Sequence, residues 1–227
     1  PWAVKESRLP GDKLAGRKQL RLADLGALFS SRRLNCAYVA SGLQLFVAAA
    51  LPAWLPTYFV RYYDLPLKSA TALAALFLAI GGAGMIACGM VSDRLVRRTS
   101  QRALMSAFYC LGSAPMLTSA FFFEPGPAQL MLLGVAMFLA AATAGPAGAI
   151  VAALTPEALH GTAFAVLTLA NNAFGLAPGP IVTGWLADRI GLQGAMQWLP
   201  FASMAAAIVF MIAARRSIAE LGAAEPA

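Results

Sequence analysis

Six apolar stretches, each long enough to cross a lipid bilayer, constrain this chain more than any other feature of its sequence. A bilayer core of about 30 Å takes about 20 helical residues. Stretches of that length run over residues 34–60, 69–92, 103–123, 128–154, 162–187 and 194–214. Lipid offers the backbone no hydrogen-bond partners, and the stretches are too long and too uniformly apolar for barrel strands. We therefore predict six transmembrane helices and an all-α membrane protein.

The composition excludes the soluble classes of protein. Hydrophobic residues make up 59% of the chain, charged residues make up only 12%, and the mean hydropathy is +0.69. A soluble fold would need about twice as many charged residues to cover its surface. Soluble enzymes, nucleic-acid-binding proteins and disordered scaffolds are therefore excluded, and the net charge of +7 has to be interpreted by position.

Basic residues gather on one side of the predicted bundle. Eight of the 17 Lys and Arg precede the first span, four lie between the second and third spans, and two follow the sixth. Only Arg61, Lys68 and Arg189 fall on the other side. Because Lys and Arg accumulate in cytoplasmic loops, we predict a multi-pass protein of the lipid bilayer with both termini in the cytoplasm, as in a bacterial inner membrane. The basic excess is then a topology signal, and no nucleic-acid partner is expected.

Three regions follow from these spans. Residues 1–33 form a basic cytoplasmic linker in which residues 19–29 have the pattern of an amphipathic surface helix, residues 34–216 form the bundle, and residues 217–227 form a cytoplasmic tail. Because the chain starts with Pro, we expect a fragment or a processed piece of a longer protein. Three cysteines, Cys36, Cys88 and Cys110, lie within spans without metal-type spacing, so neither a metal nor a cofactor is expected.

A motif that recurs 95 residues apart divides the six spans into two triplets. The pattern G-x-x-x-D-R stands at residues 89–94, at the end of the second span, and at residues 184–189, at the end of the fifth. Each copy closes the middle helix of a triplet, so the triplets are two copies of one unit. Because three is an odd number, the second copy is inverted in the membrane, and we predict a 3+3 inverted repeat.

The first copy of the motif continues through Arg97 and Arg98, and it resembles the cytoplasmic motif G-x-x-x-D-R-x-G-R-R/K of the major facilitator superfamily. Val96 stands in place of the second Gly of that motif. Residues 156–163 resemble the P-x-x-x-R-G-T-A stretch of the same family, with His160 in place of Arg. Residues 54–58 and 172–185 are similar to the organic-anion symporter and spinster-like branches.

The resemblance implies both a fold and a function. It makes the chain the carboxyl-terminal half of a twelve-helix transporter fold, with the missing amino-terminal six-helix half as its partner. The function implied is secondary active transport of a small organic solute by alternating access, which is not an enzymatic activity. By the same resemblance, the first, second, fourth and fifth helices line the solute cavity, and the third and sixth are peripheral.

Polar residues on two helices are the candidate solute contacts. In the fifth span, residues with helical spacing share one face that also holds Gly179: Thr168, Asn171, Asn172 and Gly175. In the first span, three polar residues share a face about 120° wide: Tyr38, Ser41 and Gln44. Polar groups at membrane depth need water, a solute or another helix as a partner, so hydrogen bonding between helices stays an open alternative.

Charged residues after the second span are the candidate gating residues: Asp93, Arg94, Arg97 and Arg98. We expect Asp93 to approach the positive amino-terminal end of the fifth helix, near His160 and Gly161, while the cytoplasmic side is closed. Such a contact contributes about 0.3 to 1 kcal/mol. The alternative is that these charges only fix the topology.

Prolines within the fourth and fifth spans predict bends. Pro146 lies in the fourth span, and Pro178 and Pro180 lie in the fifth. Bends in two cavity helices suit gating, and static curvature is the alternative.

Ionisable residues are missing from the depth of all six spans, so proton coupling or an anion-binding Arg would have to come from the missing half. A non-transporting membrane scaffold or receptor is the second hypothesis for function. An intramembrane enzyme fits less well, because the only histidine, His160, lies in a loop.

Overall fold

The computed structural model describes residues 29, 31–96 and 98–222, with side chains described as far as Arg215. All regular secondary structure in this part of the chain is helical, which confirms the all-α prediction. Most of the predicted surface helix at residues 19–29, the candidate gating residue Arg97 and the last five residues of the tail lie outside the described residues.

Three unbroken helices form the first triplet: α2 (Arg32–Tyr62), α3 (Leu67–Leu95) and α4 (Thr99–Phe122). Ser31 caps α2, because its side-chain oxygen accepts a hydrogen bond from the Leu34 N–H at 3.4 Å. Pro52 and Pro56 lie inside α2, and Pro115 lies inside α4, without interrupting either helix. The first three predicted spans are confirmed, each as a helix longer than predicted.

Interrupted helices form the second triplet. In chain order its elements are α5 (Pro127–Ala141), α6 (Ala144–Leu154), the 3₁₀ turn η2 (Glu157–Leu159), α7 (His160–Asn171), the π-helical segment η3 (Asn172–Leu176), α8 (Pro178–Met196) and α9 (Leu199–Gly222). Pro146 has no N–H to donate to the Ala142 carbonyl, which lies where α5 ends. Pro178 is the first residue of α8, two residues after the π segment ends at Leu176. The regular α-helix is interrupted shortly before each of these prolines, between Ala141 and Ala144 and again at the π segment, and the predicted bends stay a prediction.

The reversal between the fifth and sixth spans comes later than predicted. Gly191 has a φ of 79°, a left-handed conformation that glycine adopts without strain. The fifth span therefore continues beyond residue 187 to this glycine, and a short helical stretch from Leu192 leads into α9.

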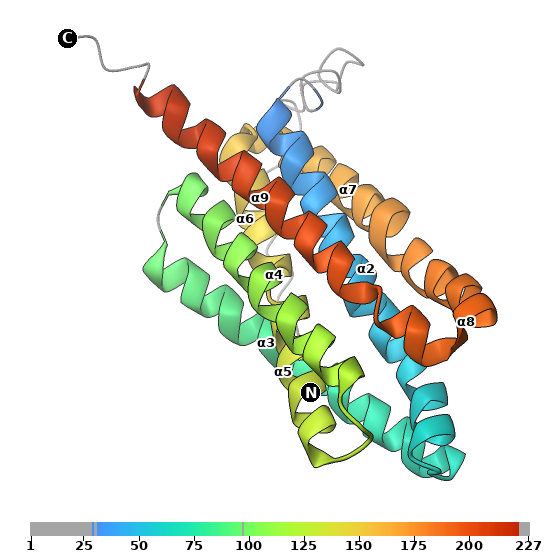
Figure 1. The fold of residues 1–227 in the computed structure, drawn as a ribbon. Helices are drawn as coiled ribbons and strands as arrows, with labels where there is room; N and C mark the ends of the chain where they lie inside the picture. Colours follow the sequence, from blue (N-terminus) through green and yellow to red (C-terminus); the bar gives the residue numbers. More distant parts are fainter. Residues whose placement is uncertain (1–28, 30, 97, 223–227) are drawn as a thin grey trace, which may run out of the picture.

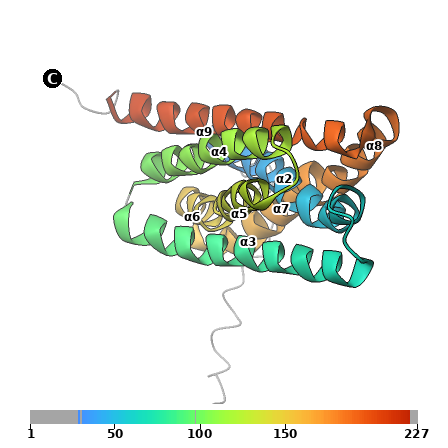
Figure 2. The same cartoon turned by 60° about the horizontal axis from the view of Figure 1, so that its bottom comes forward.

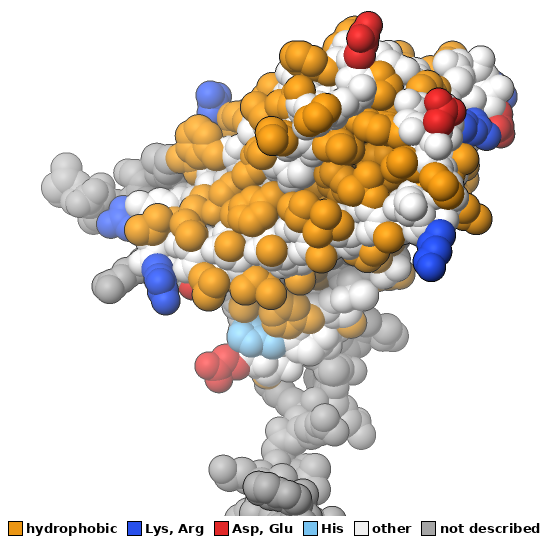
Figure 3. Space-filling model, turned by 90° about the horizontal axis from the view of Figure 1, so that it is seen from below, with side chains coloured by type: hydrophobic (Ala, Val, Ile, Leu, Met, Phe, Trp, Pro, Cys, Tyr) orange, Lys and Arg blue, Asp and Glu red, His pale blue; other side chains and the backbone are white. Residues whose placement is uncertain are grey.

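Five helical stretches in the described residues are long and apolar enough to cross a membrane, and α9 adds a shorter apolar stretch, Leu199–Arg215. The pair α5 and α6 makes one of the five, as Pro127–Leu154, and the run Glu157–Gln197 makes another. Hydrophobic side chains dominate the face of the molecule seen in Figure 3, and charged side chains lie at its margins. The chain is an integral, multi-pass membrane protein.

Helix α2 lies at the centre of the bundle, where it contacts helices of both triplets (Figure 1). Figure 2 shows α4 and α9 side by side along one side and α3 along the opposite side, with α5 and α6 between them. In the most apolar 18-residue windows, 56% of α2 is buried, against 28% of α3 and 22% of the stretch from α7 to α8. These last two elements therefore leave the most apolar surface uncovered.

The core changes in character along the bundle. Large side chains pack together toward the predicted outer end, among them Tyr58, Phe59, Phe77, Phe121 and Met137. A second cluster consists mainly of alanines from α2, α4, α6 and α9. Small residues let helix backbones approach closely. Helices α2, α4 and α9 therefore pack through large side chains in the first cluster and through small ones in the second.

Glutamine side chains close the carboxyl-terminal end of α4. Gln129 Nε2 donates to the Ala120 carbonyl at 2.8 Å. Gln193 and Gln197 donate to the Phe121 carbonyl at 3.3 and 3.1 Å. Carbonyls in the last turn of a helix have no intrahelical donor. These amides therefore satisfy the end of α4 and tie it to α5 and α8.

Candidate functional site

The run α7–η3–α8 is the most irregular of the described spanning elements. The Asn172 carbonyl accepts a hydrogen bond from the Ala177 N–H at 3.1 Å, which is the i to i+5 spacing of a π helix. Pro178 and Pro180 follow and have no N–H to continue the helix. Short π segments inside α-helices frequently lie at functional sites. The irregular backbone falls on the polar residues that the sequence selected in the fifth span.

Two glycines of this run pack directly against α2. A Cβ atom on Gly175 would lie 2.5 Å from the Gly42 carbonyl oxygen, and one on Gly179 would lie 2.6 Å from the Phe46 carbonyl oxygen. Both glycines are buried at this contact. Gly175 therefore faces α2, and the predicted stripe does not stay on one surface.

The polar part of the stripe divides into exposed and partly buried groups. Thr168 and Asn172 are exposed. Asn172 Nδ2 donates to the Thr168 carbonyl at 2.8 Å, and Thr168 Oγ1 donates to the Phe164 carbonyl at 2.9 Å. Asn171 is partly buried, and its Oδ1 has no hydrogen-bond partner among the described atoms. The exposed side-chain oxygens of Thr168 and Asn172 can accept hydrogen bonds from a bound molecule, whereas Asn171 Oδ1 is buried.

The polar residues of α2 lie inside the bundle. Tyr38, Ser41 and Gln44 are all buried. The Tyr38 hydroxyl is 3.4 Å from the Ala163 carbonyl of α7, to which it donates. Gln44 Nε2 donates to Ser113 Oγ of α4 at 3.2 Å. These bonds join helices, and the structure does not bring the three residues to the surface that carries Asn172.

The candidate gating residues lie at the predicted cytoplasmic end of α3. Asp93 Oδ1 forms an ion pair with Arg102 Nη1 at 2.7 Å, which links α3 to α4 across their loop. Arg94 and Arg98 are exposed. His160 Nε2 lies 3.0 Å from the Ala152 carbonyl and 2.9 Å from the Thr155 carbonyl, at the end of α6. The partner of Asp93 in this structure is therefore Arg102, a residue that the sequence analysis used only as a topology signal.

The second copy of the motif is held by a tryptophan that the sequence analysis did not select. Trp54 Nε1 donates to the Pro180 carbonyl at 2.9 Å, which joins α2 to α8. A Cβ atom on Gly184, the first residue of the motif, would lie 2.6 Å from the Trp54 ring. Arg189 follows Trp185 by four residues, and its guanidinium carbon lies 3.6 Å from the centre of the Trp185 ring. The only signal in the sequence was the position of Trp54 near the predicted outer interface.

Among the described residues, no three His, Cys, Asp or Glu side chains gather closely enough to hold a metal ion.

Six apolar spans in two triplets, with a central helix and an irregular backbone in a polar stripe, define a class of protein: an all-α, multi-pass membrane protein built on an internal repeat. Comparison with known proteins agrees with this class and identifies the family. The family model of the Major Facilitator Superfamily matches residues 2–176. The chain belongs to this superfamily, as its motifs predicted, and its relatives are transporters of solutes across membranes and not enzymes.

Two curated relatives illustrate the range of the family. A glucose-6-phosphate exchanger of Homo sapiens is 33% identical over 174 residues, which are 70% of this chain and 30% of that protein. The probable L-galactonate transporter of Escherichia coli (strain K12) is 28% identical over 148 residues, which are 60% of this chain and 31% of that protein. The matched part of this chain thus spans less than a third of the length of each.

Solved structures show the same fold. A bacterial homologue of the human lysosomal transporter Spinster, in an inward-facing and unoccupied conformation, has a TM-score of 0.76 at 14% identity, covering 91% of this chain and 52% of that chain. The occupied inward-facing conformation has a TM-score of 0.64 at 16% identity and covers 89% of this chain. The chain therefore has the fold of about half of a superfamily transporter.

Proposed function

We propose that this chain is the carboxyl-terminal six-helix half of a twelve-helix transporter that moves a small organic solute by alternating access. The single observation that supports this best is the 52% coverage of a solved transporter by 91% of this chain. The cavity then lies between this half and the amino-terminal half. Both termini of the chain are cytoplasmic, and the membrane is a bacterial inner membrane or its equivalent, on the support of the basic residues.

The solute class follows from the relatives and from the exposed polar groups. One relative is named for glucose 6-phosphate and another for L-galactonate, and both of these compounds are hydroxylated organic anions. Thr168 and Asn172 offer neutral hydrogen-bonding groups on an exposed surface, and the adjacent Asn171 has a buried Oδ1 without a partner, which a small shift of the irregular backbone would expose. We propose that these three residues contact solute hydroxyls, with Tyr38, Ser41, Gln44 and Gly175 shaping the helices behind them. The negative charge of the solute is then recognised by the other half.

The cytoplasmic gate in this proposal includes Asp93, Arg94, Arg97 and Arg98. Asp93 exchanges its ion pair with Arg102 for the amino-terminal end of α7 or of a helix in the other half when the cytoplasmic side closes. In the short Asp93–Arg102 pair the Asp93 side chain is 69% exposed and the Arg102 side chain is 18% exposed, so solvent reaches the carboxylate and weakens its attraction to Arg102.

The intact mass of the native gene product tests the half-transporter. A mass near twice the 23.7 kDa of this chain is expected. A native product of 23.7 kDa would contradict the proposal and favour a membrane scaffold or receptor, for which no solute flux is expected.

Substitution of Asn172 tests the solute site. In proteoliposomes that contain the full-length protein, uptake of glucose 6-phosphate and of L-galactonate is measured for Asn172→Ala. The loss of one hydrogen bond should raise KM about tenfold, with the folded yield unchanged. Thr71→Val is the control, because Thr71 is an exposed residue of α3 that bonds only to carbonyls of its own helix. An unchanged KM, or an equal change in the control, would remove Asn172 from the site.

A further inference from the structure

Two prolines in the run α7–η3–α8 remove backbone hydrogen-bond donors. A regular helix bonds each carbonyl to the N–H four residues later. Pro178 and Pro180 have no N–H, so the carbonyls of the residues four positions earlier, Phe174 and Leu176, lack that donor. Both carbonyls lie near the middle of the spanning run Glu157–Gln197. They are therefore far from the water at either membrane surface.

The two carbonyls differ in their surroundings. The Leu176 carbonyl belongs to the peptide unit that joins Leu176 to Ala177, and both of these residues are exposed. The Phe174 carbonyl belongs to the peptide unit that joins Phe174 to Gly175, and Gly175 is buried against Gly42 of α2. Of these two peptide units, the one with the Leu176 carbonyl therefore lies on the open surface of the chain.

The Leu176 carbonyl lies on the same face as the exposed polar side chains of the run. Thr168, Asn172 and Leu176 follow one another at intervals of four residues, which is close to one turn in α-helical and π-helical backbone alike. Asn172 Nδ2 donates to the Thr168 carbonyl, so Asn172 Oδ1 remains as an acceptor on this face. Asn172 Oδ1 and the Leu176 carbonyl are thus two hydrogen-bond acceptors about one turn apart.

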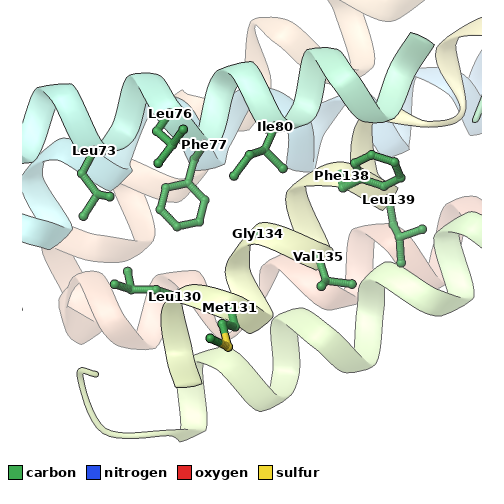
Figure 4. Close-up of a pocket in the computed structure, with 10 residues that line it drawn as sticks. All are labelled: Leu73, Leu76, Phe77, Ile80, Leu130, Met131, Gly134, Val135, Phe138 and Leu139. Carbon is green, nitrogen blue, oxygen red and sulfur yellow. The ribbon is translucent and has the colours of Figure 1, made fainter. Parts of the chain in front are cut away.

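Lipid is an unsuitable environment for this face. Irregular backbone at membrane depth is tolerated only where it is buried in protein or lines a water-filled cavity. The groove between α3 and α5 shows a surface that does suit lipid: its volume is about 880 Å³, and every side chain that lines it is apolar (Figure 4). The chain leaves the face with Asn172 and Leu176 uncovered, which favours a water-filled cavity in front of it.

We propose that the main-chain carbonyl of Leu176 accepts a hydrogen bond from a hydroxyl group of the solute, an inference that rests on the proposed function. Another hydroxyl of the same solute donates to Asn172 Oδ1. Because both groups are acceptors, this face binds the hydroxylated part of the solute and disfavours a carboxylate or a phosphate. Pro180 is then a positioning residue: it determines specificity without touching the solute, because it withholds an N–H from Leu176.

Substitution of Pro180 by alanine tests the role of the free carbonyl. Alanine supplies the missing N–H, so the Leu176 carbonyl gains its helical donor and the unfolding midpoint should not fall. Uptake is measured in proteoliposomes that contain the full-length protein, with whichever of glucose 6-phosphate and L-galactonate the parent transports. KM should rise about tenfold, as expected for the loss of one hydrogen bond. The Pro180 carbonyl, which accepts from Trp54 Nε1 at 2.9 Å, is retained in this variant.

Pro178→Ala is the matched control. Pro178 is partly buried, as Pro180 is, and lies two residues away on the same helix. Its replacement restores the donor of the Phe174 carbonyl, whose peptide unit packs against α2, so KM should stay unchanged. An equal rise of KM in the two variants would assign the effect to the shape of the helix and overturn the proposal.

Analogues of the solute that lack single hydroxyl groups give a result that a change of helix shape cannot produce. In the parent, removal of the hydroxyl that binds Leu176 should raise KM about tenfold. In Pro180→Ala, that analogue and the complete solute should have the same KM, because the carbonyl no longer accepts a bond from the solute. If the variant distinguishes every analogue from the complete solute as well as the parent does, the carbonyl is not a solute contact.

A second variant covers the case in which Pro180→Ala does not fold. Pro180→Gly supplies the same N–H with a smaller residue, and the same rise of KM is expected. Failure of the proposed function has a different signature, since the parent would then take up neither solute, and both proposals would fail together. A parent that transports the solute with a KM that Pro180→Ala leaves unchanged would overturn the carbonyl contact alone.

Discussion

The two inverted triplets share a layout and a motif, but they differ in the continuity of their helices. Helices α2, α3 and α4 are unbroken, although α2 contains two prolines. The second triplet is interrupted between α5 and α6 and again at η3. A proline alone therefore does not break these helices. In the described residues, the irregular helical backbone is confined to the triplet that carries Asn171 and Asn172.

Pairs of glycines that are 95 residues apart allow the two triplets to be compared position by position. Gly84 in α3 and Gly179 in α8 are 95 residues apart, and a Cβ atom on either would collide with the backbone of a neighbouring helix, at Phe138 and Phe46. Gly89 and Gly184 are also 95 residues apart, yet a Cβ atom on Gly89 meets nothing within 4 Å. One glycine pair is thus equivalent in the two triplets, and the other pair is not.

Substitution of the equivalent glycines should have the largest effect. Gly84→Ala and Gly179→Ala each force two helix backbones apart, and each should lower the free energy of unfolding by about 2 to 3 kcal/mol. The thermal unfolding midpoint of the full-length protein in detergent measures this loss. Gly82→Ala is the control, because a Cβ atom there meets nothing within 4 Å. A loss in only one of the two variants would show that the triplets are not equivalent at this contact.

Substitution of the unequal glycines should have a smaller and one-sided effect. Gly184→Ala displaces the Trp54 ring and should cost about 1 to 2 kcal/mol. Gly89→Ala should be neutral or stabilise α3 slightly, because alanine is the better helix former. Unfolding midpoints of the two variants, compared in one detergent, measure the difference. Equal midpoints would contradict the role assigned to Trp54.

The hydrogen bond of Trp54 should have a smaller effect again. Trp54→Phe keeps an aromatic ring on Gly184 but leaves the Pro180 carbonyl without its donor, at a cost of about 1 kcal/mol. Trp198→Phe is the matched control, because Trp198 is exposed and its ring packs against Phe201 in a tilted arrangement. If the unfolding midpoint of Trp54→Phe is no lower than that of Trp198→Phe, the Trp54 indole stabilises the protein through its ring and not through its hydrogen bond.

Breaking the ion pair of the first motif should change stability least. Asp93→Asn should cost less than about 1 kcal/mol, because the pair is exposed. The same variant should slow solute uptake in proteoliposomes while membrane insertion stays intact. Arg102→Gln should reproduce the stability change if the pair acts as a unit. Uptake by Asp93→Asn at the parent rate would exclude a gating role for this residue.

Sequence patterns predicted the spans because membrane burial imposes a simple rule on composition and length. The fourth span was placed correctly, but the fifth was ended too early, at residue 187, and the π segment was not foreseen. The prediction for Thr168 to Gly175 assumed 100° per residue, and a π segment departs from that spacing from Asn172 onward. Gly175 consequently faces α2. Partners such as Trp54 and Pro180, which are 126 residues apart, leave no periodic signal at all.

The sequence by itself determined that the chain is a membrane protein of six helices in two related triplets, because apolar length, basic loops and a repeated motif are properties of local sequence. Tertiary structure alone decided which residues meet: Gln44 with Ser113, Asp93 with Arg102, and Trp54 with the second motif. The reason is physical. The bilayer acts on each span separately through its hydrophobicity, whereas close packing and hydrogen bonding depend on which helix lies opposite, and at what rotation.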